Sequence, residues 1–222
     1  MEKLPKINVI YEDNHIIVVE KKPNILVQKD NTNDICLMDL IKDYLKTKYN
    51  KPGNVYLGLV HRLDRPVGGI MVFAKTSKAA SRLSDTIRKH ELKKTYYAVV
   101  LGHTPKNGHF EDYMIKDTNK NISYISNDKN AKLAILEFVT INYYKNYSLV
   151  KINLITGRSH QIRVQFSHHG YPLIGDQKYN KKATPNTNVA LFAKKIEFIH
   201  PTTKENLSFE LDLPNTYPFN LF

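Results

Sequence analysis

Short apolar runs separated by polar turn residues make up most of this 222-residue chain. Two of these runs, 7–11 and 16–20, flank the polar residues 12–15, which predicts an N-terminal β-hairpin. Runs rich in β-branched and aromatic residues predict further strands at 56–60, 70–74, 94–100, 133–141 and 147–155. Strands are therefore expected to dominate the fold.

Helical spacing of apolar residues occurs in fewer places. A helix is predicted over 36–49, with Asn33 or Asp34 placed to cap it, and a second one over 75–91. Ser159 can cap a third helix that runs to His169, and Gly170 would end it. Residues 103–130 are rich in Asn, Asp, Lys and Gly, which predicts loops and short hairpins.

The order of these elements indicates the fold class. Predicted strands outnumber predicted helices, and the two do not alternate as they do in parallel α/β proteins. We expect an α+β fold, with a mostly antiparallel mixed sheet, flanking helices and a central basic cleft. No internal repeat or linker interrupts the chain, so a single domain over 1–222 is expected.

The charge balance points to a polyanionic partner. The chain has 33 Lys and Arg against 21 Asp and Glu, which gives a net charge of +12. Residues 75–107 contain eight Lys or Arg against two acids, a net +6 and half of the total. Such an excess suits nucleic acid, through phosphate contacts and counterion release. A lysine-rich, solvated surface without a partner is the alternative.

Other protein classes find little support. No apolar run approaches the roughly 20 residues of a membrane helix, and the N-terminus lacks the apolar core of a signal peptide. The single cysteine, Cys36, excludes an internal disulfide framework. The histidines near residue 160 lack the spacing of zinc ligands, so no metal is expected. A cytoplasmic protein is the expectation.

Candidate chemistry gathers in the loop between the predicted strands 56–60 and 70–74. Asp64 lies in this loop and is flanked by Arg62 and Arg65. Nearby cations favour the charged form of a carboxylate, so Asp64 should stay ionised. The alternative is a loop aspartate that only pairs with its own arginines.

The wider string around Asp64 carries a family resemblance. The segment His61-Arg62-Leu63-Asp64, followed by Gly69 and Ala74-Lys75, resembles the signature of RluA-type pseudouridine synthases, which place their catalytic aspartate in an H-R-L-D loop. Further family motifs match in the right order: E-D-x-x-x-x-V-x-x-K-P from Glu12, K-x-Y-x-A from Lys94, L-x-T-G-R-x-H-Q-I-R-V from Leu154 and G-x-P-L-x-G-D-x-x-Y from Gly170.

The resemblance covers about 8–215 and corresponds to the catalytic domain alone, without the S4-type RNA-binding domain that many relatives carry. It extends to a closing strand from Ala190 through Phe198, beside which 207–213 would pair. Two departures stand out. The family commonly has Thr-Ser where this chain has Val67-Gly68, and an extra lysine precedes Pro23.

The resemblance implies an RNA pseudouridine synthase that isomerises uridine in rRNA or tRNA, without a cofactor and as a monomer. Asp64 would be the catalytic carboxylate, as covalent nucleophile or as base. Arg163 would pair with Asp64 and hold it ionised. Tyr96 would stack on the flipped uracil, and Arg62 would fill the gap that the base leaves in the RNA.

Alternatives stay open at this point. A catalytically inactive RNA-binding protein on the same scaffold would fit Val67-Gly68, although Asp64, Tyr96 and Arg163 argue against it. An enzyme that hydrolyses glycosidic bonds would need a second carboxylate to activate water, and no acid lies near Asp64 in the sequence. Tyr96 could be a core residue, and Arg158 and Arg163 could bind phosphates.

Overall fold

The computed structural model describes residues 6–32 and 34–222. They divide into two compact units, each of which the chain enters twice. Unit 1 comprises Met1–Leu92 and Lys195–Leu211, and unit 2 comprises Lys93–Lys194 and Asp212–Phe222. The expectation of a single domain over 1–222 stays a prediction, and each unit is described by itself.

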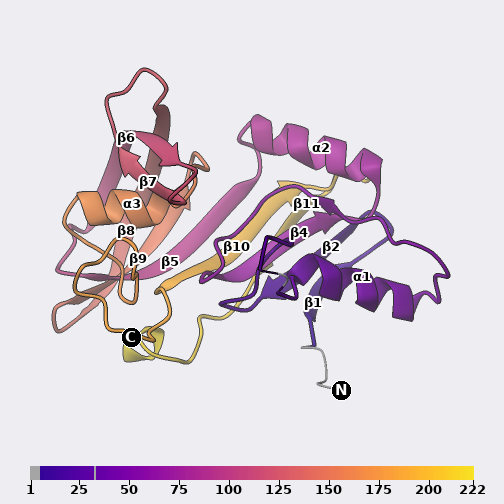
Figure 1. Ribbon diagram of the computed structural model, residues 1–222, viewed down its shortest axis with the longest axis horizontal. Coiled ribbons are helices and arrows are strands. Elements are labelled where there is room, and N and C mark those ends of the chain that lie inside the picture. Colours follow the sequence, from indigo (N-terminus) through magenta and orange to yellow (C-terminus); the bar gives the residue numbers. More distant parts are fainter. Residues whose placement is uncertain (1–5, 33) are drawn as a thin grey trace. The chain divides into compact units, whose positions relative to one another are not determined.

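Unit 1 contains sheet strands, most of them in antiparallel pairs, and two helices (Figure 1). Its elements are β1 (Asn8–Glu12), β2 (Ile16–Lys21), α1 (Leu37–Lys48), β3 (Gly58–Leu59), β4 (Gly68–Ala74), α2 (Ser77–Arg88), the second part of β10 (Leu191–Ile199) and β11 (Asn206–Glu210). β2 pairs with β1 and β4, β3 pairs with β4, and β11 pairs with β10. Ala79 and Leu83 of α2 pack on Val18 and Val72 of the sheet, where apolar burial stabilises the unit.

Most of the expected elements of unit 1 are confirmed, with shifted ends. β1 and β2 form the predicted hairpin. The helices predicted over 36–49 and 75–91 are present as the shorter helices α1 and α2. The capping prediction is wrong for Asp34, because Cys36 occupies the N-cap of α1 and the Asp34 carboxylate pairs with Arg65 instead. Asn33 lies outside the described residues. The predicted strand 56–60 shrinks to β3, whereas β4 begins two residues early.

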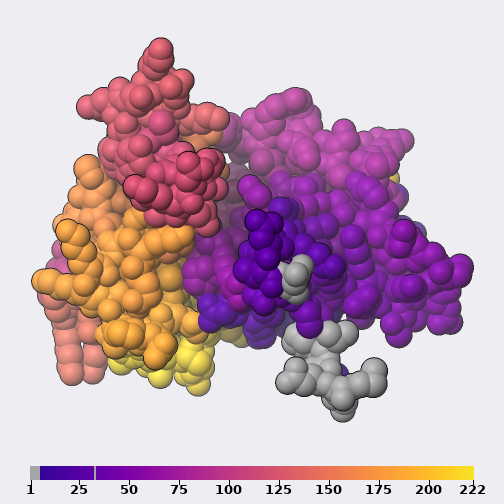
Figure 2. Space-filling view, in the orientation of Figure 1, coloured from indigo at the N-terminus to yellow at the C-terminus, as the bar shows by residue number. Residues whose placement is uncertain are grey.

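Unit 2 is a second antiparallel arrangement, covered by one helix. Its elements are β5 (Lys93–Leu101), β6 (Asn107–Asp117), β7 (Ile122–Ile125), β8 (Lys132–Tyr144), β9 (Tyr147–Leu154), α3 (Gln161–His168), the first part of β10 and a 3₁₀ turn (Phe219–Leu221). The strand order is β5-β9-β8-β6-β7. Phe166 of α3 packs on Phe110 of β6 and Phe138 of β8. In the space-filling view the region around β6 and β7 (rose) projects from this unit (Figure 2).

One expectation for unit 2 is confirmed in part, and another is wrong. β6 and β7 form a hairpin, as expected, but β6 is an eleven-residue strand that also pairs with β8. Phe110 and Met114 are its buried residues, and the others are partly or fully exposed, so its composition resembles that of a loop. Ser159 does not cap α3, because His160 takes the N-cap position in a left-handed conformation with φ of 54°. Gly170 follows the helix with φ of 87°, as expected for a residue that ends it.

The predicted α+β fold, with antiparallel strand pairs and flanking helices, is confirmed. The basic cleft stays a prediction. Among the helices of the described residues, none has the length and apolar character needed to span a bilayer.

Candidate functional site

The Asp64 loop in unit 1 connects β3 to β4. The backbone N–H of Val67 donates to the carbonyl oxygen of Asp64 at 3.0 Å, which closes a tight turn around Pro66. At the start of the loop, Nε2 of His61 accepts a hydrogen bond from the N–H of Val72 in β4, at 3.1 Å. The neutral ring therefore carries its proton on Nδ1. His61 thus ties the start of the loop to β4.

A buried lysine binds the backbone of this loop at the residues that follow Asp64. The amino group of Lys21, at the end of β2, donates to the carbonyl oxygens of Lys22 at 3.2 Å, Arg65 at 2.9 Å and Val67 at 2.6 Å. The side chain is completely buried. Burial lowers the pKa of the Lys21 amino group to about 7, and the negative charge of Asp64 opposes this shift. Lys21 thus fixes the loop backbone on both sides of Pro66, a role that the sequence analysis missed.

The arginines beside Asp64 do not neutralise it. The guanidinium of Arg65 pairs with Asp34 at 2.7 Å and donates to the carbonyl of Asn24 at 3.3 Å. Arg62 is exposed, and its side chain makes no hydrogen bond or ion pair with the residues that the structure describes. The alternative of an aspartate paired with its own flanking arginines is therefore wrong.

Two places where the chain departs from the family pattern lie side by side here: Gly68, and Pro23 with its extra preceding lysine. A β-carbon on Gly68 would lie 3.0 Å from Cδ and 3.1 Å from Cγ of Pro23, and 3.3 Å from the carbonyl oxygen of Lys21. The ring of Pro23 thus occupies the space that a side chain at residue 68 would need. Glycine at residue 68 permits this close approach.

In unit 2, the guanidinium of Arg163 forms a two-point ion pair. Nε and Nη2 of Arg163 donate to the two carboxylate oxygens of Asp176, at 2.8 Å and 2.7 Å. The side chains are 5% and 0% exposed. The backbone N–H of Lys178 donates to the same carboxylate at 3.1 Å. The pair therefore fixes the plane of the guanidinium.

Tyr179 completes the surroundings of Arg163. The centre of its ring lies 5.2 Å from the guanidinium carbon, and its hydroxyl lies 2.6 Å from Nδ1 of His160. Gly175, at φ of 71°, precedes Asp176, and a β-carbon there would lie 2.1 Å from the carbonyl oxygen of Asn188. Asp176 and Tyr179 stand in the G-D-x-x-Y motif, so their spacing was visible in the sequence although their partner was not.

Tyr96 lies in β5, opposite Ile152 of β9, which lies opposite Phe138 of β8. Since Phe138 packs on Phe166 of α3, Tyr96 is on the face of the strands that α3 covers. Its side chain is 5% exposed. The predicted stacking on a uracil is not tested by this placement.

The four predicted site residues divide equally between the units. Asp64 and Arg62 lie in unit 1, and Tyr96 and Arg163 lie in unit 2. The pairing of Asp64 with Arg163 stays a prediction.

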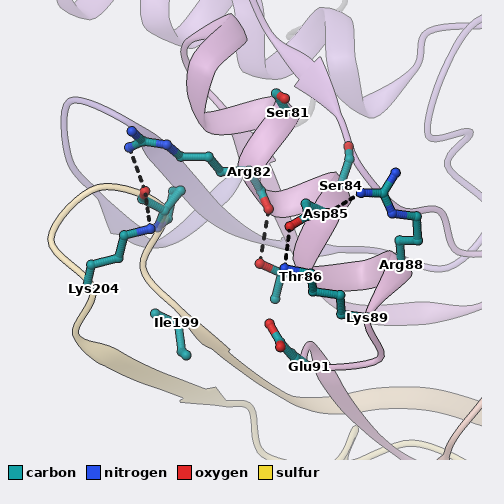
Figure 3. A pocket seen from close by; sticks show the side chains of 11 residues that line it. Ser81, Arg82, Ser84, Asp85, Thr86, Arg88, Lys89, Glu91, Ile199 and Lys204 are labelled. Atoms are coloured by element: carbon teal, nitrogen blue, oxygen red, sulfur yellow. Dashed lines mark hydrogen bonds and ion pairs between the residues drawn. The ribbon is translucent and has the colours of Figure 1, made fainter.

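The basic helix α2 lines a groove of about 770 Å³ in unit 1 (Figure 3). Cationic side chains outnumber acidic ones in its lining: Arg82, Arg88, Lys89 and Lys204 against Asp85 and Glu91. Arg82 and Lys204 both donate to the carbonyl oxygen of Pro201, so they hold the wall of the groove (Figure 3). Arg88 and Lys89 both pair with Asp85.

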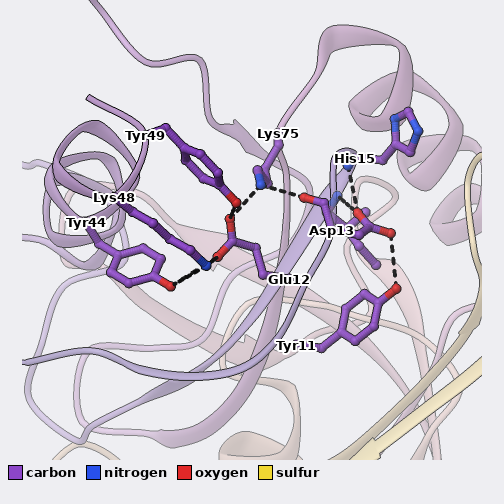
Figure 4. Close-up of polar contacts among 9 residues, drawn as sticks. Tyr11, Glu12, Asp13, His15, Tyr44, Lys48, Tyr49 and Lys75 are labelled. Carbon is purple, nitrogen blue, oxygen red and sulfur yellow. Dashed lines mark hydrogen bonds and ion pairs between the residues drawn. The ribbon is translucent and has the colours of Figure 1, made fainter. Parts of the chain in front are cut away.

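A second polar cluster in unit 1 is saturated with internal contacts (Figure 4). The carboxylate of Glu12 accepts from Lys75 at 2.6 Å, Lys48 at 2.7 Å and Tyr49 at 2.8 Å. Burial works against its charge, but these hydrogen bonds hold the pKa of Glu12 down to about 2. The cluster joins β1 to α1 and to the residue after β4.

No group of three or more potential metal ligands occurs in the described part of the chain.

Comparisons with known proteins give matches over most of the chain. Residues 15–168 match the family model described as RNA pseudouridylate synthase. Ribosomal large subunit pseudouridine synthase D of Haemophilus influenzae is 31% identical, over 97% of this chain and 70% of that protein. The enzyme of the same name from Zymomonas mobilis is 30% identical, over 94% and 69%. The solved structure of human RNA Pseudouridylate Synthase Domain Containing 4 has a TM-score of 0.79 at 20% identity, over 93% of this chain and 88% of that one.

Proposed function

Because this chain belongs to the RNA pseudouridylate synthase family, we propose that it isomerises uridine to pseudouridine in large-subunit ribosomal RNA, with Asp64 as the catalytic residue. The family match and the motifs support the reaction, and the names of the relatives support the substrate. In this reaction the bond from N1 to C1′ breaks, the base turns, and C5 bonds to C1′. C5 loses its proton and N1 gains one, so nothing is oxidised or reduced and no cofactor is consumed.

The observation that carries this proposal is the Asp64 turn. Its backbone is held by Lys21 and His61, while neither flanking arginine binds its carboxylate. A carboxylate on a backbone fixed in this way is held in place to act as nucleophile or base. Arg62, exposed and uncommitted among the described residues, suits the role of filling the space that a flipped base leaves.

We assign Tyr96 to stacking on the uracil and Arg163 to holding the Asp64 carboxylate. A planar aromatic ring suits a base taken out of its helix. The guanidinium of Arg163, already oriented by Asp176, suits a second carboxylate because arginine presents five donors. The α2 groove supplies cations for the RNA backbone. A monomeric, cytoplasmic protein remains part of the proposal.

Asp64→Asn tests the assignment, because it preserves shape and removes the charge. Unmodified large-subunit ribosomal RNA is incubated with each variant, and pseudouridine is quantified by nucleoside mass spectrometry. We expect Asp64→Asn to form none while its RNA affinity stays within a few-fold of the original. The matched control is Asp34→Asn, which removes a carboxylate bound to the same loop. Turnover by the Asp64 variant at a tenth of the original rate would exclude Asp64 as the catalytic residue.

RNA binding without turnover by the unaltered protein would instead favour the inactive RNA-binding alternative. Transfer RNA, tested in parallel, separates the two candidate substrates.

A further inference from the structure

Lys94 is the second residue of β5 and belongs to the K-x-Y-x-A motif, but the proposed function gives it no role. Side chains alternate along a strand, so Lys94 projects from the same side as Tyr96, and Lys93 from the opposite side. Two strand residues span about 7 Å. Lys94 is partly buried, whereas Lys93 is exposed.

The Lys94 amino group has no acceptor within residues 6–32 and 34–222: it makes no hydrogen bond or ion pair there. Lys21 and Lys75, whose side chains are also withdrawn from solvent, are both paired. The Lys21 ammonium donates to three carbonyls, and Lys75 binds the Glu12 carboxylate. Burial lowers the pKa of Lys94, and no other group offsets that shift. A partly desolvated cation without a partner costs free energy, which an arriving anion would recover.

The amino group of Lys94 lies beside an exposed glycine. Nζ of Lys94 lies 3.5 Å from the position that a β-carbon would take on Gly157, and Gly157 is exposed. The loop that contains Gly157 is held in place, because Oε1 of Gln161 accepts from the hydroxyl of Thr156 at 2.8 Å and from the N–H of Arg158 at 3.0 Å. The amino group therefore lies beside a fixed loop that presents no side chain at Gly157.

We propose that Lys94 is a positioning residue that binds an RNA phosphate adjacent to the target uridine. The inference rests on the proposed function, in which Tyr96 stacks on that uridine's base. A separation of about 7 Å along the strand is one that a single nucleotide can span from base to phosphate. Lysine suits a phosphate because its ammonium acts as a compact point charge.

The first test measures the charge state of Lys94 directly. Lysine side chains are labelled with carbon-13, and the pKa of each amino group is followed by NMR, with and without a short uridine-containing RNA hairpin. The Lys94 resonance is assigned by its loss in Lys94→Arg. RNA should raise the pKa of Lys94, because a phosphate favours the ammonium form, and leave that of Lys93 unchanged. An unchanged Lys94 pKa in the RNA-bound protein would overturn the inference.

The second test uses kinetics on unmodified large-subunit ribosomal RNA. Lys94→Met keeps an apolar stem and removes the charge, and it should raise KM about tenfold, the loss expected for one charged hydrogen bond. Its kcat should change little, because a phosphate contact made equally in ground and transition states alters only binding. Lys94→Arg should restore most of the affinity, and the matched control Lys93→Met should leave KM as it was.

Stability separates this role from a structural one. Because Lys94→Met removes a cation that lacks a partner, its melting temperature should equal or exceed the original. A fall in melting temperature with an unchanged KM would make Lys94 structural and overturn the inference. Equal KM values for Lys93→Met and Lys94→Met would also overturn the inference. If the unaltered protein made no pseudouridine, the proposed function would fail, and the NMR titration would still decide whether Lys94 binds phosphate.

Discussion

The buried pair of Arg163 and Asp176 should be strongly coupled, and a double-mutant cycle can measure the coupling. The side chains are 5% and 0% exposed, and two charged hydrogen bonds of 2.8 Å and 2.7 Å join them. Removing either partner breaks both charged hydrogen bonds of a buried ion pair, which costs about 3–5 kcal/mol. We expect Asp176→Asn and Arg163→Met each to lower the free energy of unfolding by that amount.

The double variant should lose much less than the sum of the two, because either single substitution already breaks the ion pair between Arg163 and Asp176. A non-additivity of about 2 kcal/mol or more is expected. Urea unfolding, followed by circular dichroism, gives the four free energies. The matched control is the same cycle on Arg88 and Asp85, an ion pair whose side chains are 80% and 38% exposed. Exposed pairs contribute about 1 kcal/mol or less.

Equal coupling energies in the two cycles would refute the reasoning from burial. The variants also bear on catalysis. Asp176 orients the guanidinium that we assign to Asp64, so Asp176→Asn should lower kcat more than it raises KM. A variant that folds and turns over normally would show that Arg163 needs no such orientation.

Three further predictions concern unit 1. Glu12→Gln should lower stability by about 3 kcal/mol at neutral pH. In the original protein this contribution is complete above pH 4.5 and is lost as the pH falls toward 2, so urea unfolding of the two proteins should converge in acid. The folded-state pKa of Lys21, about 7, lies below its ordinary 10.5, so between these values the unfolded state binds more protons and stability should rise with pH. Lys21→Met should flatten that rise. Parallel curves of unfolding free energy against pH for the variant and the original protein would contradict the lowered pKa of Lys21. Gly68→Ser should cost about 1–3 kcal/mol by overpacking against Pro23, and adding Pro23→Ala should restore part of it; additive losses in calorimetry would argue against the contact.

Much of the fold could be predicted from local patterns, because buried and exposed positions alternate where a strand covers a core. These patterns do not predict the length of β6, because only two of its eleven residues are buried and pairing with β8, rather than composition, makes the strand. They also fail at the ends of α1 and α3. Cys36 and His160 occupy those N-cap positions without a side-chain cap, a choice made by the surrounding chain rather than by capping preference.

The site was only partly visible for a related reason. Asp64 could be singled out because its motif is local. Lys21 could not, because a buried lysine that binds three carbonyls reads in sequence like the exposed Lys22 beside it. Asp176 belongs to a recognisable motif, but its partner Arg163 lies thirteen residues earlier, in α3. The pairing depends on the path of the chain between them, which the sequence pattern does not give.

The contact of Gly68 with Pro23 shows what single-position comparison with a family cannot reveal. Taken separately, glycine in place of serine at residue 68 suggests a more flexible loop. The extra lysine before Pro23 suggests a change without effect on the loop. In the structure, the proline displaced by Lys22 packs on the backbone of the glycine, while Lys21 binds the carbonyls on either side of Pro66. Glycine at residue 68 therefore leaves room for the ring of Pro23. The loop that carries Asp64 keeps its support through packing and buried hydrogen bonds, so the altered residues are no argument for an inactive protein.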